Sequence, residues 1–97
     1  MCKLDEILAR RDEVNALVRK NRAGRMFVFG SCARKEETPE SDIDFLVSFE
    51  PGATLFDQAR LGLALQEMFG CKADVIASSA LDDPDFGPHV RKDLVAV

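Results

Sequence analysis

The chain has 97 residues, 46% of them hydrophobic and 31% charged, with a formal net charge of −4 at pH 7. These values indicate one ordinary globular domain over residues 1–97 and argue against non-specific binding to a nucleic-acid backbone, which needs a basic face. No apolar run approaches the roughly 20 residues that span a bilayer, and no signal-peptide core follows the first residues, so we expect a cytoplasmic protein.

The first predicted element is a helix that begins near Leu4 and stops at Gly24. Its apolar residues recur at helical spacing; they are Leu4, Ile7, Leu8, Val14, Leu17 and Val18. A short buried strand is predicted from Arg25 to Gly30, because four apolar residues stand in succession there. Gly30 ends this strand, and we expect a short helical turn from Ser31 to Arg34.

After a polar loop at 35–40, residues 42–49 alternate between two kinds of side chain, which is typical of a strand. One face carries the apolar set Ile43, Phe45, Val47 and Phe49. The other face carries Asp42, Asp44, Leu46 and Ser48. The alternation therefore predicts a strand with its apolar face in the core and both aspartates on the opposite face.

Three further elements complete the predicted fold. Thr54 and Asp57 have the spacing of a capping box, so a second helix is expected from there to Gly70. A third strand is predicted over residues 72–77, with Asp74 as its only acid. A final short helix is expected from Pro88. Apolar residues expected to pack inward are Leu55, Leu63 and Phe69 on the second helix, and Phe86, Val90 and Leu94 near the last.

The order helix, strand, strand, helix, strand, helix predicts a small α/β domain. We expect a short mixed sheet with helices packed mainly on one face. The three cysteines are widely spaced and odd in number, which argues against a disulfide framework and a structural zinc site.

Asp42 and Asp44 are two residues apart on an extended segment, so both side chains point the same way. Two carboxylates on one face repel, and each raises the pKa of the other unless a cation lies between them. A divalent metal that also holds a triphosphate is the simplest such cation. The alternative reading is a solvated strand face that binds nothing.

The Gly30-Ser31 turn suits a phosphate group. Glycine lets the backbone approach a ligand closely, and the N–H groups of a helical turn and the Ser31 hydroxyl attract phosphate oxygens. Ser31 can also serve as a helix N-cap, and the two roles are compatible. Arg34 lies one turn further on, where it either meets a phosphate or pairs as a surface charge with Glu36 or Glu37.

Two segments, Gly30-Ser31-Cys32-Ala33-Arg34 and Ser41-Asp42-Ile43-Asp44-Phe45-Leu46-Val47, together resemble the minimal nucleotidyltransferases of the DNA polymerase beta superfamily. The likeness continues to Asp74-Val75 and covers roughly residues 25 to 97. It implies a nucleotidyltransferase fold, two magnesium ions and ATP as substrate. It further implies that Asp42, Asp44 and Asp74 are catalytic metal ligands and that Gly30 and Ser31 hold the phosphates.

The resemblance also implies a partner, because proteins of this kind are commonly antitoxins paired with a HEPN-domain toxin. We therefore expect transfer of a nucleoside monophosphate, AMP from ATP, to a tyrosine hydroxyl of the partner; the chain itself has no tyrosine. One alternative is a non-catalytic module that neutralises its partner by contact. Another is an enzyme acting on a small molecule or a nucleic-acid end, and the acidic balance disfavours the nucleic acid.

Overall fold

The computed structural model describes residues 3–36, 42–85 and 87–97. The expected polar loop beyond residue 36 and the expected core residue Phe86 lie outside this part. The elements in chain order are α1 (Lys3–Ala9), α2 (Arg11–Lys20), β1 (Ala23–Phe29), α3 (Gly30–Ala33), β2 (Ile43–Phe49), α4 (Leu55–Phe69), β3 (Ala73–Ala77), the 3₁₀ helix η1 (Ser78–Asp82), α5 (Gly87–Arg91) and β4 (Val95–Ala96). None of the described helices is both long enough and apolar enough to cross a membrane, and the cytoplasmic location stays a prediction.

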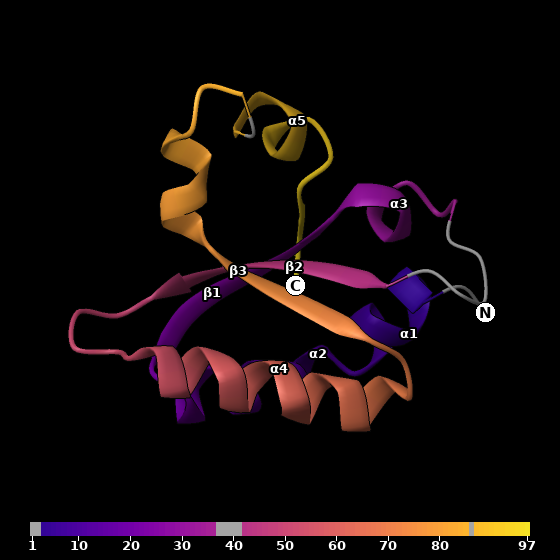
Figure 1. Cartoon of the computed structure of the whole chain (residues 1–97). Coiled ribbons are helices and arrows are strands. Elements are labelled where there is room, and N and C mark those ends of the chain that lie inside the picture. Colours follow the sequence, from indigo (N-terminus) through magenta and orange to yellow (C-terminus); the bar gives the residue numbers. More distant parts are fainter. Residues whose placement is uncertain (1–2, 37–41, 86) are drawn as a thin grey trace.

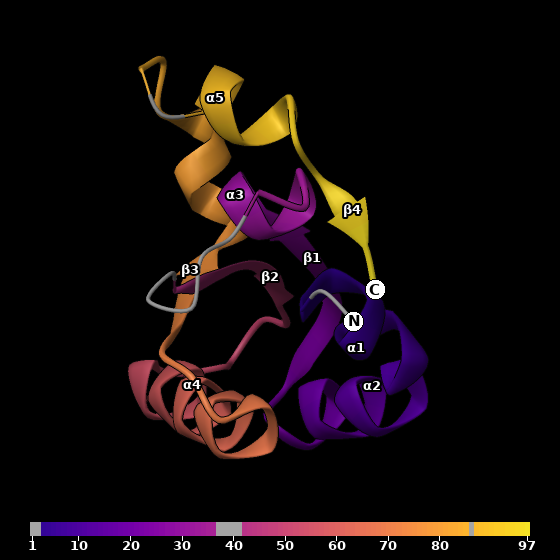
Figure 2. The same ribbon diagram turned by 90° about the vertical axis from the view of Figure 1, so that its right-hand side faces the viewer.

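Within the described residues, four strands form one sheet in the order β3-β2-β1-β4. β1 runs antiparallel to both β2 and β4, whereas β2 and β3 are parallel, so the predicted mixed sheet is confirmed. Figures 1 and 2 show α1, α2 and α4 on one face of the sheet, and α3, η1 and α5 on the other. The longer helices thus pack on one face, as expected.

The alternation of β2 separates two apolar clusters on the two faces of the sheet. Ile43, Phe45 and Val47 are buried in the larger cluster, which the helices α1, α2 and α4 complete. Leu46 belongs to a smaller cluster on the other face, together with Phe29 of β1 and Val90 of α5. This arrangement confirms the two faces predicted for β2, and it leaves Asp44 on the face of the smaller cluster.

The predicted first helix is in fact two helices, and the break lies at Arg10. At the break, the Arg10 guanidinium donates a hydrogen bond to the main-chain oxygen of Met68 at 3.0 Å and lies over the Phe69 ring. These contacts tie the chain to the end of α4. No fully buried residue lies between Ile7 and Val14 to hold a continuous helix against the core.

Gly24 was also predicted wrongly as the end of this helix. The helix α2 ends at Lys20, and Asn21 follows it with its side-chain amide donating to the Leu17 carbonyl at 2.9 Å. Gly24 instead lies in β1, where the register with β2 shifts between Ala23 and Arg25, as in a β-bulge. The short strand β4 was not predicted, because two residues carry no readable alternation.

The helix α4 begins and ends as its sequence predicts. The Asp57 carboxylate accepts a hydrogen bond from the Thr54 backbone at 2.8 Å, the Thr54 hydroxyl accepts from the Asp57 backbone, and Gly70 ends the helix with φ of 65°. Phe69 is buried as expected. Leu55 and Leu63 were expected to face the sheet, but their side chains are 81% and 63% exposed.

The capping box gives a direct test of α4. Replacing Thr54 with alanine removes the side-chain acceptor at the N-terminus, and we expect it to lower the free energy of unfolding by about 1 kcal/mol. Chemical denaturation monitored by circular dichroism measures this loss. The variant Thr54→Ser keeps the acceptor and should be nearly neutral; an equal loss in both variants would contradict the capping role.

Candidate active site

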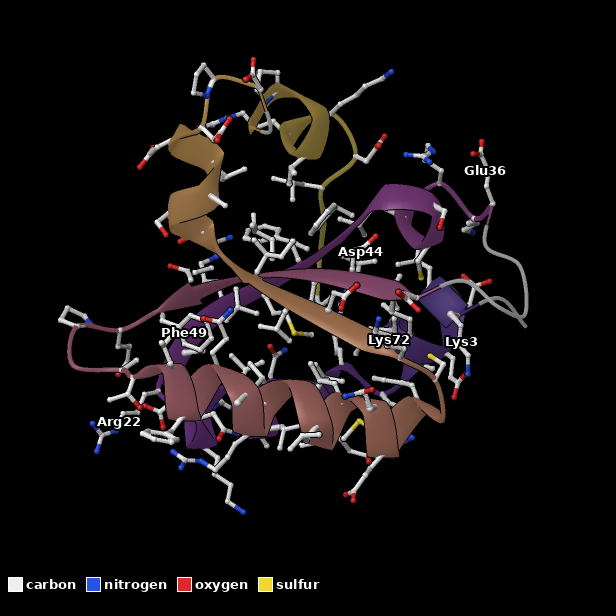
Figure 3. All side chains as sticks on the ribbon, in the orientation of Figure 1. Lys3, Arg22, Glu36, Asp44, Phe49 and Lys72 are labelled. Carbon is white, nitrogen blue, oxygen red and sulfur yellow. The ribbon has the colours of Figure 1, made fainter. Side chains whose placement is uncertain are left out.

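Two of the predicted carboxylates lie directly beside each other. Asp44 of β2 and Asp74 of β3 are register partners in the parallel pair, so their side chains leave the same face of the sheet on strands about 4.8 Å apart. Figure 3 shows Asp44 on the side of the sheet opposite α4. The parallel pairing of β2 with β3 thus brings together two acids from distant parts of the sequence.

Asp42 lies just before β2, two residues from Asp44, and its side chain is partly exposed. Its carboxylate is 3.8 Å from the ammonium nitrogen of Lys72, which precedes β3. Sequence reasoning did not single out Lys72, although its place two residues before Asp74 puts both on the same side of an extended segment. The Lys72 ammonium therefore already balances part of the negative charge of these aspartates.

The electrostatics of Asp44 show how closely the acids interact. Its pKa is raised, first by burial and then by the negative charges of Asp74 and Asp42. A cation among these side chains would remove the repulsion, and carboxylate oxygens are the donors that magnesium prefers. The donor set thus fits a divalent metal, although no three described acidic, histidine or cysteine side chains converge closely enough to form a metal site. The metal site stays a prediction.

Gly30 brings the glycine turn against these acids. Phe29, the last residue of β1, pairs with Asp44, and Gly30 follows with φ of 74°, a conformation that favours glycine. A β-carbon on Gly30 would lie 2.7 Å from Oδ2 of Asp44, which is closer than a side chain tolerates. The two halves of the motif, ten residues apart, therefore lie against each other, and a side chain at Gly30 would have to displace the Asp44 carboxylate.

Ser31 follows Gly30 in the short helix α3 and is partly buried. Its main-chain oxygen accepts a hydrogen bond from the Glu36 N–H at 2.9 Å, which closes the turn after α3. Cys32, the next residue, is buried in the core and packs as a small apolar side chain. Ser31 is thus held on the same side of the sheet as the acids, beside Gly30.

Arg34 is engaged by acids of the chain itself. Its guanidinium donates hydrogen bonds to Glu36 at 3.1 Å and to Asp93 at 2.6 Å, and these two contacts raise its pKa. Pairing with Glu36 was one of the two predicted alternatives, and the structure adds Asp93, 59 residues away. No sequence signal pointed to Asp93, because only the folded C-terminal segment brings it there.

The family of the chain follows from its sequence as a whole. The sequence model of the family described as "Nucleotidyltransferase domain" matches residues 4–96. The chain belongs to the nucleotidyltransferase domain family. It is accordingly a nucleotidyltransferase, and the glycine turn and the acids of β2 and β3 lie together on one face of the fold.

Two curated relatives of this nucleotidyltransferase come from Methanocaldococcus jannaschii. "Putative protein adenylyltransferase MJ0435" is 40% identical over 62 residues, which cover 64% of this chain and 67% of the relative. "Putative protein adenylyltransferase MJ0128" is 30% identical over 95 residues, which cover 98% of this chain and 95% of the relative. The second relative therefore matches along almost the whole length of both proteins.

Solved structures share the fold of this nucleotidyltransferase. A protein described as a "putative minimal nucleotidyltransferase" superposes with a TM-score of 0.83 and 39% identity, covering 97% of this chain and 95% of the other. An MNT antitoxin structure, from the complex with the tri-AMPylated HEPN toxin of Shewanella oneidensis, has a TM-score of 0.65 and 17% identity, covering 99% and 71%. A toxin–antitoxin structure with AMP-PNP has a TM-score of 0.69 and 18% identity, covering 88% and 69%.

Proposed function

We propose that this nucleotidyltransferase moves AMP from ATP onto a hydroxyl group of a partner protein, with pyrophosphate as the leaving group, acting as one domain over residues 1–97. The observation that carries the proposal is the contact of Gly30 with Asp44, beside Asp74 on the neighbouring strand. Gly30 has no side chain, so a triphosphate can approach the backbone of the turn, and the paired carboxylates beside it suit the metal that accompanies a triphosphate. The relatives named as protein adenylyltransferases support a protein as the acceptor.

In this proposal each residue of the site has a separate task. Asp42, Asp44 and Asp74 hold magnesium, with two ions expected, and Gly30 and Ser31 hold the phosphates through their backbone and the Ser31 hydroxyl. Bound magnesium supplies positive charge that offsets the charge developing on the phosphates. Asp74 also accepts the proton of the attacking hydroxyl. Arg34 would have to exchange Glu36 or Asp93 for a phosphate oxygen to contact the triphosphate.

We further propose that the partner is a HEPN-domain toxin and that this chain is its antitoxin. The support is the shared fold with an MNT antitoxin whose HEPN toxin partner is tri-AMPylated in that complex. The chain has no tyrosine, so a tyrosine acceptor would have to come from another protein. The same fold would serve a module that neutralises its toxin by contact alone. The experiment therefore has to distinguish neutralisation by nucleotide transfer from neutralisation by binding.

The test measures whether a label on ATP is incorporated into the partner protein. With magnesium and a HEPN-domain protein as the proposed partner, ATP labelled at the α-phosphate should label the partner, whereas ATP labelled at the γ-phosphate should not. The variant Asp42→Asn/Asp44→Asn should transfer no label. Equal labelling by wild type and variant, or none by either, would refute the transfer; full neutralisation of the toxin by the variant would favour binding alone.

A further inference from the structure

The two carboxylates that hold Arg34 differ in how firmly they hold it. The Asp93 side chain is only 14% exposed and lies 2.6 Å from the guanidinium, whereas the Glu36 side chain is 66% exposed and lies at 3.1 Å. Short charge-assisted hydrogen bonds are the stronger ones, and ion pairs between exposed side chains contribute little. Asp93 is therefore the firm partner of Arg34, and Glu36 is the partner that Arg34 can give up.

Asp93 lies in a C-terminal segment that is fixed on both sides. Before it, Val90 of α5 is buried in one cluster with Phe29, and the Asp93 N–H donates a hydrogen bond to the Val90 carbonyl at 3.1 Å. After it, Val95 of β4 pairs with Val28 of β1. Figures 1 and 2 show this segment running beside α3 on its way to β4. The fold thus gives the Asp93 carboxylate a fixed place next to α3.

Arg34 is tied through its backbone to the turn that begins at Gly30. The Arg34 N–H donates a hydrogen bond to the Gly30 carbonyl at 3.2 Å, so Arg34 lies one helical turn after the glycine that packs against Asp44. One turn rises about 5.4 Å, which an arginine side chain can span. The Arg34 side chain is also 43% exposed, so a ligand can reach it. A phosphate bound at the turn would therefore lie within reach of the guanidinium.

The guanidinium of Arg34 keeps donors available for a phosphate. Arginine carries five N–H groups in a planar fork. Nη1 donates to Asp93 and Nε donates to Glu36, and within the described part of the chain no residue accepts a hydrogen bond from Nη2. Release of Glu36 would free Nε next to Nη2, and two parallel N–H groups of this kind bind a phosphate in a bidentate manner. Nη1 can stay on Asp93 throughout.

We propose that Asp93 is a positioning residue for nucleotide binding, which keeps Nη1 of Arg34 while Glu36 leaves and Nε and Nη2 meet the triphosphate. The inference rests on the proposed function, in which this site binds ATP. A long side chain loses conformational freedom when a ligand immobilises it, and a guanidinium that is already anchored loses less. Asp93 acts only through Arg34 and does not itself contact the phosphates.

The sign of the effect on ATP binding distinguishes positioning from simple charge repulsion. Removing a carboxylate near a bound triphosphate lowers the negative charge there, which by itself strengthens anion binding. Positioning predicts the opposite for Asp93. Asp93→Ala should raise the Kd for ATP with magnesium, measured by calorimetry on the full chain, about tenfold, and Asp93→Asn, which keeps an acceptor oxygen, should raise it less.

Glu36→Gln is the matched control, because it removes the other carboxylate from the same guanidinium. It should leave the Kd for ATP unchanged or lower it up to about threefold, since Arg34 no longer has to give up a charged partner. Unchanged or tighter binding of ATP by both Asp93 variants would overturn the proposal. So would a rise in Kd for Glu36→Gln as large as that for Asp93→Ala, or no binding of ATP by the wild type.

A second background separates positioning from a loosened C-terminal segment. In Arg34→Gln the guanidinium is absent, so adding Asp93→Ala should change the Kd for ATP by less than about twofold. A purely structural role of Asp93 would instead raise the Kd equally in both backgrounds, and this result would also overturn the proposal.

The proposed transfer and the role of Asp93 fail in different assays. Transfer is measured as label on the partner protein, whereas positioning is measured as the Kd for ATP without any partner. If Asp93→Ala weakens ATP binding only when Arg34 is present but no label reaches the partner, the positioning role stands and the transfer falls. If label is transferred but Asp93→Ala binds ATP as the wild type does, the positioning role falls and the transfer stands.

Discussion

Replacing Asp44 with asparagine is expected to abolish nucleotide transfer while it makes the protein without ligand more stable. Burial and the charges of Asp74 and Asp42 raise the pKa of Asp44, so the charged form is disfavoured in the folded state. Asparagine has similar shape and no charge. We expect activity to fall by more than about 100-fold, since even residues that only orient metal ligands commonly cost about 10- to 100-fold.

The gain in stability expected for Asp44→Asn over the wild type should increase with pH. A carboxyl whose folded pKa lies above its unfolded value of about 3.9 binds protons on folding, so the wild type loses stability as pH rises through the two values. Asp44→Asn removes that loss. The thermal midpoint of the variant should therefore exceed that of the wild type at pH 7, and the difference should shrink toward pH 3.

With magnesium and ATP bound, the wild type should become more stable than Asp44→Asn. A ligand at about ten times its Kd adds about 1.4 kcal/mol, which for a domain of this size raises the thermal midpoint by about 5–10 °C. The wild type should show this shift and Asp44→Asn should not. As a control, Asp12→Asn changes an exposed acid on α2 and should behave as wild type. A destabilised Asp44→Asn, or one that keeps the ligand shift, would contradict the site.

The second large effect is expected from Gly30→Ala. An alanine there adopts a positive φ, which costs about 1–2 kcal/mol, and its β-carbon meets the Asp44 carboxylate at 2.7 Å. Either the turn or the carboxylate has to move. A displacement of about 1 Å in a catalytic group can cost about 100-fold in rate, and we expect a loss of that order in label transfer.

Gly70 provides the matched control for Gly30. It has φ of 65° at the end of α4, and a β-carbon there meets nothing within 4 Å. Gly70→Ala carries the same cost of a positive φ without the contact, so it should lower the thermal midpoint by about 4–8 °C per kcal/mol of that cost and leave transfer intact. Equal rates in the two variants would show that the contact with Asp44 has no role in transfer.

The placement of Asp44 could be predicted from the sequence because strand alternation is a strong signal. The alternation of β2 assigned Ile43 and Phe45 to the core and Asp44 to the opposite face, as the structure confirms. Asp74 was linked to Asp44 through the resemblance, and their proximity in the structure depends on β3 lying parallel to β2. The contact of Gly30 with Asp44 depends on the register of β1, which no local pattern reveals.

Other structural features could not be predicted from local sequence patterns. The helix α4 carries apolar residues on both its buried and its exposed face, so helical spacing alone did not decide which leucines face the sheet, and Leu55 and Leu63 were assigned wrongly. At the break, Arg10 donates a hydrogen bond to Met68, 58 residues away. Asp93 meets Arg34 only through the fold. Contacts between residues distant in sequence, such as these two, leave no local pattern to read.

The two-sided character of β2 makes the chain intolerant of insertions and deletions there. Side chains alternate strictly along a strand, so the loss of one residue would exchange the faces of everything beyond it. Asp44 would turn toward α4 in the interior, and the neighbouring apolar residues would turn outward to the catalytic surface. Homologues that keep the chemistry should therefore vary in length in the connections between strands and keep the spacing from Asp42 to Val47 unchanged.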